Sequence, residues 1–109
     1  MTAALPVVAG PRPDLPTPDV SEAVAAASLL AEPIRAGILR MLADGPHCVC
    51  EMAAALDARE NNVSNHLARL RDAGLVRAGR HEANARFLYY ERDEEAVRRA
   101  LEAMREILA

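Results

Sequence analysis

The sequence contains no lysine and no tryptophan, and aromatic side chains make up only 3% of its 109 residues. Without large aromatic rings, the hydrophobic core must be built from aliphatic side chains and alanine, which favour close packing of helices. A chain of this length supports one compact domain. Because such a core is modest for a single chain, burial of further apolar surface between two copies is the natural supplement.

The sequence also lacks any apolar run near the roughly 20 residues that a membrane-spanning helix needs. The N-terminal segment has neither the basic start nor the uninterrupted apolar stretch of a secretory signal peptide. We therefore predict a cytoplasmic protein with no membrane partner. In that reducing compartment the two cysteines are expected to bind a metal or to sense oxidation rather than to form a structural disulfide, which would be strained between residues two apart.

Charge argues at first against nucleic acid, because the net charge is −3 and neutralisation of phosphates is the main source of affinity for DNA. The distribution of charge matters more than the total. Acidic side chains gather toward the two ends of the chain, whereas arginines, which are the only residues of the lysine and arginine class, cluster in the middle. The central arginines are Arg59, Arg69, Arg71, Arg77, Arg80 and Arg86. The middle of the chain therefore remains a candidate for contact with DNA.

The chain divides into an arm and a domain. Residues 1–18 contain five of the seven prolines and are predicted to form a disordered or extended arm. In residues 19–109, apolar residues at helical spacing predict helices that cover about 19–31, 33–42, 48–56, 60–73 and 93 to the end. Between the last two helices the period changes to two, which predicts strands at 75–78 and 86–90 joined by a polar loop that projects as a wing.

These elements predict an α+β fold that is mainly α, a winged helix-turn-helix with five helices and a two-stranded β-hairpin. The last helix carries an apolar stripe that has no obvious partner inside so small a domain, and the first helix carries another. We therefore predict a homodimer in which both helices form the interface. The predicted interface residues are Val24, Val97, Leu101, Met104 and Leu108.

Residues 60–71 have the arrangement of a recognition helix, with an apolar side and a polar side. Val63, Leu67 and Leu70 are predicted to face inward. The side chains predicted to face the major groove are Asn61, Asn62, Ser64, Asn65 and Arg69. Asparagine pairs well with adenine edges, and arginine pairs with guanine or with phosphate. The alternative is an ordinary solvated face.

Two further arginines, Arg80 and Arg86, lie at the ends of the predicted wing, where they suit contact with phosphate or the minor groove, with Arg77 as a helper. Ordinary surface arginines on a hairpin are the alternative. His66 on the recognition helix either contacts phosphate or lies against the preceding helix.

Cys48 and Cys50 are predicted to lie in the first turn of the helix that precedes the recognition helix. Side chains two apart on an ideal helix point about 200° apart, so both thiolates reach one ion only if one cysteine lies in the cap or if the turn unwinds. Unwinding offers a mechanism, because it distorts the helix that supports the recognition helix. Free N–H groups at a helix start favour the thiolate form. The alternative is that both are small buried hydrophobic residues.

Four segments resemble, in order and spacing, the ArsR/SmtB family of bacterial metal-responsive repressors. They are Leu-Ala-Glu-Pro-Ile-Arg at 30–35, Cys-Val-Cys-Glu at 48–51, Val-Ser-Asn-His-Leu-Ala-Arg-Leu-Arg-Asp-Ala-Gly-Leu-Val at 63–76, and Phe-Leu-Tyr-Tyr at 87–90. The resemblance implies a homodimeric repressor that binds double-stranded operator DNA in its own promoter. It also implies that the repressor dissociates when a metal or metalloid binds.

The resemblance includes departures that bear on the inducer. The third cysteine of arsenic-sensing relatives is replaced by Ala53, the arm has no cysteine, and the last helix lacks the histidines of zinc-sensing relatives. Cys48 and Cys50 remain as metal ligands, with His47, a carboxylate, water or a small thiol as the third ligand. This set predicts As(III) or Sb(III), or else Cd(II) or Pb(II), as the inducer.

The residues leave alternatives open, among them a DNA-binding domain with no inducer, because the ligand set is incomplete. The same two thiols could serve a winged-helix repressor that responds to oxidation or reactive sulfur instead of metal. An enzyme is not predicted, because the cysteine pair has neither a strand-turn-helix setting nor a base with a third orienting group.

Overall fold

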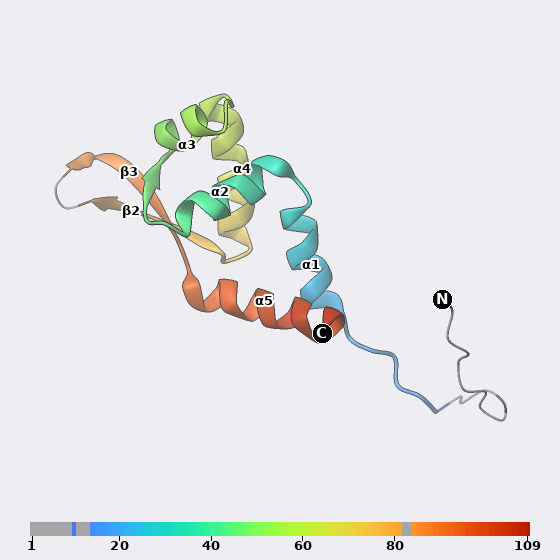
Figure 1. Ribbon diagram of the computed structural model, residues 1–109. Coiled ribbons are helices and arrows are strands. Elements are labelled where there is room, and N and C mark those ends of the chain that lie inside the picture. Colours follow the sequence, from blue (N-terminus) through green and yellow to red (C-terminus); the bar gives the residue numbers. More distant parts are fainter. Residues whose placement is uncertain (1–9, 11–13, 82–83) are drawn as a thin grey trace.

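The computed structural model describes residues 10, 14–81 and 84–109. Its elements are α1 (Ser21–Leu30), α2 (Pro33–Leu42), β1 (His47–Cys48), α3 (Val49–Ala55), α4 (Glu60–Asp72), β2 (Val76–His81), β3 (Asn84–Arg92) and α5 (Glu94–Leu108). Helices α2, α3 and α4 form the body of the domain, and the β2–β3 hairpin projects from it as a wing (Figure 1). The predicted fold class is confirmed.

The sheet differs from the prediction in two ways. It has three antiparallel strands in the order β1-β3-β2, because the two-residue strand β1 pairs with β3. The hairpin strands are also longer than predicted, since residues 79–81, 84 and 85, expected in the loop, belong to β2 and β3. After a register shift between Arg80 and His81, the pairing resumes between His81 and Asn84, which the alternation of apolar residues alone does not reveal.

The core explains the orientation of α4. Val63, Leu67 and Leu70 are almost completely buried, as predicted, and they pack with Ile38 of α2 and Met52 of α3. Non-directional apolar contact of this kind stabilises the assembly of the three helices. Gly74 ends α4 at a φ of +80°, a conformation that glycine adopts without strain.

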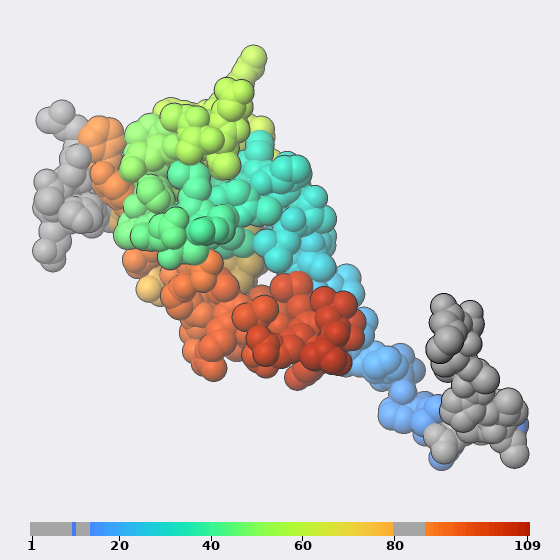
Figure 2. Space-filling model, in the orientation of Figure 1, coloured from blue at the N-terminus to red at the C-terminus, as the bar shows by residue number. Residues whose placement is uncertain are grey.

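Helices α1 and α5 pack against each other beside this body, so that the C-terminus lies near the start of α1 (Figure 1). Asp93 caps α5 by accepting a hydrogen bond from the N–H of Ala96 at 3.0 Å. No residue of α5 is fully buried, and this helix forms one side of the molecular surface (Figure 2). Leu101 is 49% exposed and Leu108 is 83% exposed.

The predicted arm falls largely outside the described residues, which include only residue 10 and residues 14–18 of it; these are exposed and have no regular structure. No helix in the described part of the chain combines the length and the apolar character that a membrane crossing requires.

Candidate functional site

The two cysteines meet at the start of α3. Cys48 ends β1 and is the N-cap residue of α3, with an extended backbone (φ −85°, ψ 165°), and Cys50 is the second residue of the helix. Their Cα atoms are 5.5 Å apart, and the two sulfurs are joined as a disulfide. Cys48 is buried and Cys50 is exposed.

This geometry decides between the two arrangements that the sequence allowed. Because Cys48 lies in the cap, its side chain is not held to the helical angle, and the sulfurs meet while α3 stays regular. Unwinding of the turn is therefore not needed. The structure pairs the two sulfurs directly, because an extended residue at the cap brings the Cα atoms to a separation that suits a disulfide. The role of the reduced pair as metal ligands stays a prediction.

Glu51 organises the backbone around the cysteines. Its Oε1 accepts a hydrogen bond from the N–H of Cys48 at 3.1 Å, and its Oε2 lies 3.2 Å from Nδ1 of His47. The hydrogen bond from Cys48, followed by the one from His47, holds the pKa of Glu51 below its ordinary value. His47 thus faces Glu51, and among the described residues no group of three or more His, Cys, Asp or Glu side chains is arranged to hold a metal ion.

The Glu51 contact leads to a prediction about stability. Glu51→Ala should lower the free energy of unfolding by about 0.5–2 kcal/mol, which is typical for loss of a helix cap. Because the pKa of Glu51 is lower in the folded than in the unfolded state, its charge stabilises the fold above the unfolded pKa, and this contribution disappears as the pH falls through the folded pKa. Urea unfolding as a function of pH would measure it. Glu51→Gln is the control, because it keeps a cap but does not titrate.

The cysteine pair is connected both to the wing and to α4. In the β1–β3 ladder, His47 pairs with Tyr90 and Cys48 pairs with Tyr89, so the N-terminal side of the pair is attached to a wing strand. On its C-terminal side, α3 packs against α4. The cysteine pair therefore lies at the junction between the wing and α4.

The structure exposes the predicted DNA-reading face. The side chains of Asn61, Asn62, Ser64, Asn65 and Arg69 lie together on the exposed side of α4. Arg59 is the N-cap residue of α4 and makes no side-chain capping hydrogen bond.

The wing arginines are less completely described. Arg80 lies in β2 and Arg86 in β3, but their side chains lie outside the described residues. Arg77 pairs with Glu91 across the hairpin at 2.8 Å, and this hydrogen bond raises the pKa of Arg77. The Arg77 side chain is 61% exposed, so this pair adds little stability, and the role of Arg77 as a helper in DNA contact stays a prediction.

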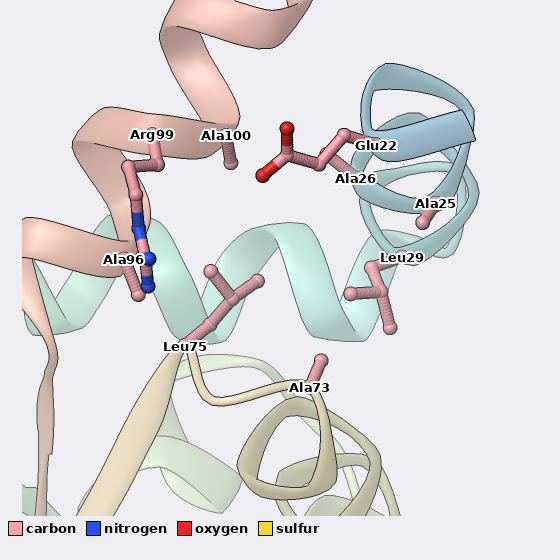
Figure 3. A pocket seen from close by; sticks show the side chains of 9 residues that line it. All are labelled: Glu22, Ala25, Ala26, Leu29, Ala73, Leu75, Ala96, Arg99 and Ala100. Atoms are coloured by element: carbon pink, nitrogen blue, oxygen red, sulfur yellow. The ribbon is translucent and has the colours of Figure 1, made fainter. Parts of the chain in front are cut away.

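A hollow of about 210 Å³ lies between α1, α5 and the segment that follows α4. Alanine and leucine side chains line most of it, and Glu22 and Arg99 face it from opposite helices (Figure 3). It is smaller than the roughly 300–1,000 Å³ of typical ligand pockets.

Comparison with known proteins agrees with this architecture. Residues 32–78 match the family described as bacterial regulatory protein, arsR family. A solved structure described as a possible transcriptional regulator for arsenical resistance is 30% identical, with a TM-score of 0.61 over 77% of this chain and 80% of that chain. The chain belongs to the arsR family. The family and its fold are those of DNA-binding transcriptional regulators and not of enzymes, as the sequence indicated.

Two further relatives of this arsR-family protein differ in how much of it they match. The arsenical resistance operon repressor of Escherichia coli K12 is 43% identical over 49 residues, which are 44% of this chain. The chain covers 42% of that relative, less than half of its length. Reduced HlyU from Vibrio cholerae N16961 is 29% identical, with a TM-score of 0.63 over 78% of this chain and 87% of that chain.

The contacts of His66 are more specific than the sequence predicted. His66 is half-buried, and its ring nitrogens face Arg35 of α2 and Glu32, the N-cap residue of α2. The sequence predicted contact with phosphate or with the preceding helix, whereas Arg35 and Glu32 lie more than 30 residues earlier in the chain. In the sequence, Arg35 stands out only as part of a segment that resembles the family.

Proposed function

We propose that this arsR-family protein is a dimeric repressor that binds operator DNA through α4 and the wing and leaves it when a trivalent metalloid binds Cys48 and Cys50. The observation that carries the proposal is the convergence of the two sulfurs at the start of α3, between the wing strand β3 and the recognition helix. The similarity to the arsenical resistance operon repressor of Escherichia coli supports arsenic as the element.

The chemistry of the donor set favours a metalloid over a metal ion. Two cysteine thiols react with arsenite, As(OH)₃, to form two As–S bonds, and two water molecules leave while one hydroxyl stays on arsenic. Antimonite reacts in the same way. Such a product needs only two protein ligands, which is what the described residues bring together. Cd(II) and Pb(II), the other predicted inducers, would need further ligands from His47, from water or from a small thiol.

The response follows from what the sulfurs are attached to. Insertion of arsenic between the two sulfurs would change their separation and so shift the cap of α3, where Glu51 accepts from the Cys48 N–H and where Cys48 pairs with Tyr89. Both the position of α3 under α4 and the angle of the wing depend on this backbone. Small changes there reduce DNA affinity because base contacts require the recognition helix and the wing to fit together.

The dimer is proposed from the exposed apolar surface of α1 and α5. Val24 is 56% exposed and Leu101 49% exposed, and Val97 and Met104 are only partly buried. These side chains, with Leu108, lie along one side of the helix pair. A second copy that covers this side would bury them and place two recognition helices for two operator half-sites.

The proposed DNA face leads to a second prediction. Asn65→Ala should change operator preference, with a loss of about 1–3 kcal/mol at the contacted base pair, because Asn65 is exposed on α4. Arg80→Ala should weaken binding to all duplexes and reduce the salt slope by about one, because a phosphate contact carries no sequence information. Fluorescence anisotropy with operator and mutated duplexes measures both. Parent-like binding by both variants would contradict the assignment of the face.

A second candidate function is favoured by the disulfide itself. Two thiols and one molecule of hydrogen peroxide give the Cys48–Cys50 disulfide and two water molecules, so the pair could report oxidation. To separate the two functions, reduced protein on operator DNA is treated with arsenite or with peroxide. Release by arsenite alone supports metalloid sensing, and release by peroxide alone supports the redox candidate.

A further inference from the structure

The guanidinium of Arg35 lies where three helices meet. Its Nε donates to the carbonyl oxygen of Leu29 at 2.8 Å, and its Nη2 donates to that of Ser28 at 3.2 Å. Both carbonyls belong to the last turn of α1, where backbone oxygens have no partner within the helix and carry partial negative charge. The third nitrogen, Nη1, lies 3.2 Å from Nδ1 of His66 on α4. One side chain of α2 therefore holds the end of α1 and the middle of α4.

This arrangement selects one form of the His66 ring. A guanidinium only donates hydrogen bonds, so Nδ1 of His66 must be the acceptor and must carry no proton. The proton of the neutral ring then lies on Nε2, which is 3.6 Å from Oε2 of Glu32. Glu32 is itself held in place, because Oε2 accepts a hydrogen bond from the backbone N–H of Arg35 at 2.9 Å. Both ring nitrogens thus face groups that α2 holds in place.

A directional contact of this kind does what the apolar core does not. Val63, Leu67 and Leu70 keep α4 against the body of the domain, but apolar contacts are non-directional and tolerate a small rotation or a slide. The hydrogen bond from Arg35 to His66 weakens steeply when its angle or length changes. It therefore limits the small rotations of α4 about its own axis that remain once the core has set which side of the helix faces inward.

We propose that His66 is a positioning residue for operator recognition. Held as the Nε2–H tautomer by Arg35 and Glu32, it fixes the rotation of α4 that presents Asn62 and Asn65 on the exposed face. Through Arg35 it also ties that rotation to α1. The inference rests on the proposed role of α4 in reading DNA, and it adds the residue that sets the orientation of this helix.

Two variants of His66 test the proposal. In His66→Asn, the carbonyl oxygen stands at the δ position, where Nδ1 stands in histidine, so it can still accept from Arg35. In His66→Leu, a side chain of the same branching has no acceptor. The measurement is the ratio of affinity for operator over a scrambled duplex. We expect the asparagine variant to stay within about threefold of the parent and the leucine variant to lose about 10- to 100-fold, as loss of a hydrogen bond to a charged group implies.

A merely structural role would give the opposite order, because leucine has the higher helix propensity and suits a half-buried position. Circular dichroism and sedimentation of both variants show whether the folded dimer is retained. If His66→Leu forms a folded dimer with the parent's ratio, the proposal is overturned.

Helix α2 also carries a control for Arg35, the residue that contacts His66, because Arg40 lies on the same helix. Arg35→Gln should reduce the operator-to-scrambled ratio as much as His66→Leu does, and the double variant should be no worse than either single one. Arg40→Gln is the control, because it removes the same charge from α2 at an exposed side chain that pairs only with Asp44 among the described residues. Equal ratios for the two arginine variants would contradict the proposal.

Nitrogen-15 NMR of the histidine ring is independent of any variant. We expect the parent dimer on DNA to show the proton of His66 on Nε2, and a proton on Nδ1 would overturn the proposal. The operator preference of the unmutated protein distinguishes failure of the proposed function from failure of the His66 inference. If the unmutated protein shows no preference for the operator, the proposed function fails and the inference fails with it. If the unmutated protein prefers the operator but the His66 and Arg35 variants behave like it, the DNA-binding function stands without this positioning role.

Discussion

Cys50→Ser is expected to retain the dimer and its operator affinity but to lose release from DNA by arsenite or antimonite completely. Cys50 is exposed and lies inside a regular helix, so serine replaces it with little change in packing. When the Cys50 thiol is absent, the metalloid keeps only one bond to the protein and no longer links Cys48 to α3. Release of a labelled operator duplex during titration of reduced protein measures the effect.

Cys48→Ser should lose the response in the same way. Serine is a good N-cap residue, which offsets part of the cost of a hydroxyl at this buried position. The double variant should be no worse than either single one, because a chelate that has been lost once cannot be lost again. His47→Ala distinguishes the third ligand: a need for more metalloid would assign that role to His47. Release of DNA from the double variant at parental concentrations would refute the assigned sensor site.

Leu101→Asp is expected to produce monomers that bind operator poorly. Leu101 is 49% exposed in the single chain, so aspartate should leave the fold intact, but in the proposed dimer its charge would be buried without a partner. An uncompensated buried charge costs about 3–5 kcal/mol, so the dissociation constant of the dimer should rise by roughly 100- to 4,000-fold. Adding Met104→Asp should strengthen the effect. Analytical ultracentrifugation and operator titration report the two consequences.

The control for the interface is Arg98→Asp, which introduces the same side chain on α5 at a position whose side chain is 67% exposed. It should leave sedimentation unchanged. A Leu101→Asp variant that sediments like the parent would count against α5 as the interface, and a monomer that still binds operator tightly would separate dimerisation from DNA binding.

The helices were predictable because their signals are local. Spacing of apolar residues along 60–73 indicated which side of α4 faces the core, and Val63, Leu67 and Leu70 are buried there. The exposed position of the candidate DNA-contact residues on α4 follows from the same period. Strand β1 was not predictable, because two residues carry no period and their partners in β3 lie about 40 residues later.

At the cysteine site, too, local sequence signals predicted one part of the structure and a distant segment decided the rest. The residue types and their spacing identified Cys48 and Cys50 as a candidate pair, and the helical angle showed that only a cap or an unwound turn could bring them together. Pairing of β1 with β3 gives Cys48 its extended backbone and thereby selects the cap. The position of Cys48 in the cap thus depends on β3, a strand that follows α4 in the sequence.

By itself, the sequence determined the five helices, the inward side of α4 and the pair of thiols, because helix propensity, apolar period and side-chain chemistry all act within a few residues. Only the tertiary structure decided that Cys48 lies in a strand and that Arg35 holds His66, since these contacts join residues 41 and 31 positions apart. Hydrogen bonds between such segments form only after the apolar core has brought them together, so no local pattern in the chain records them.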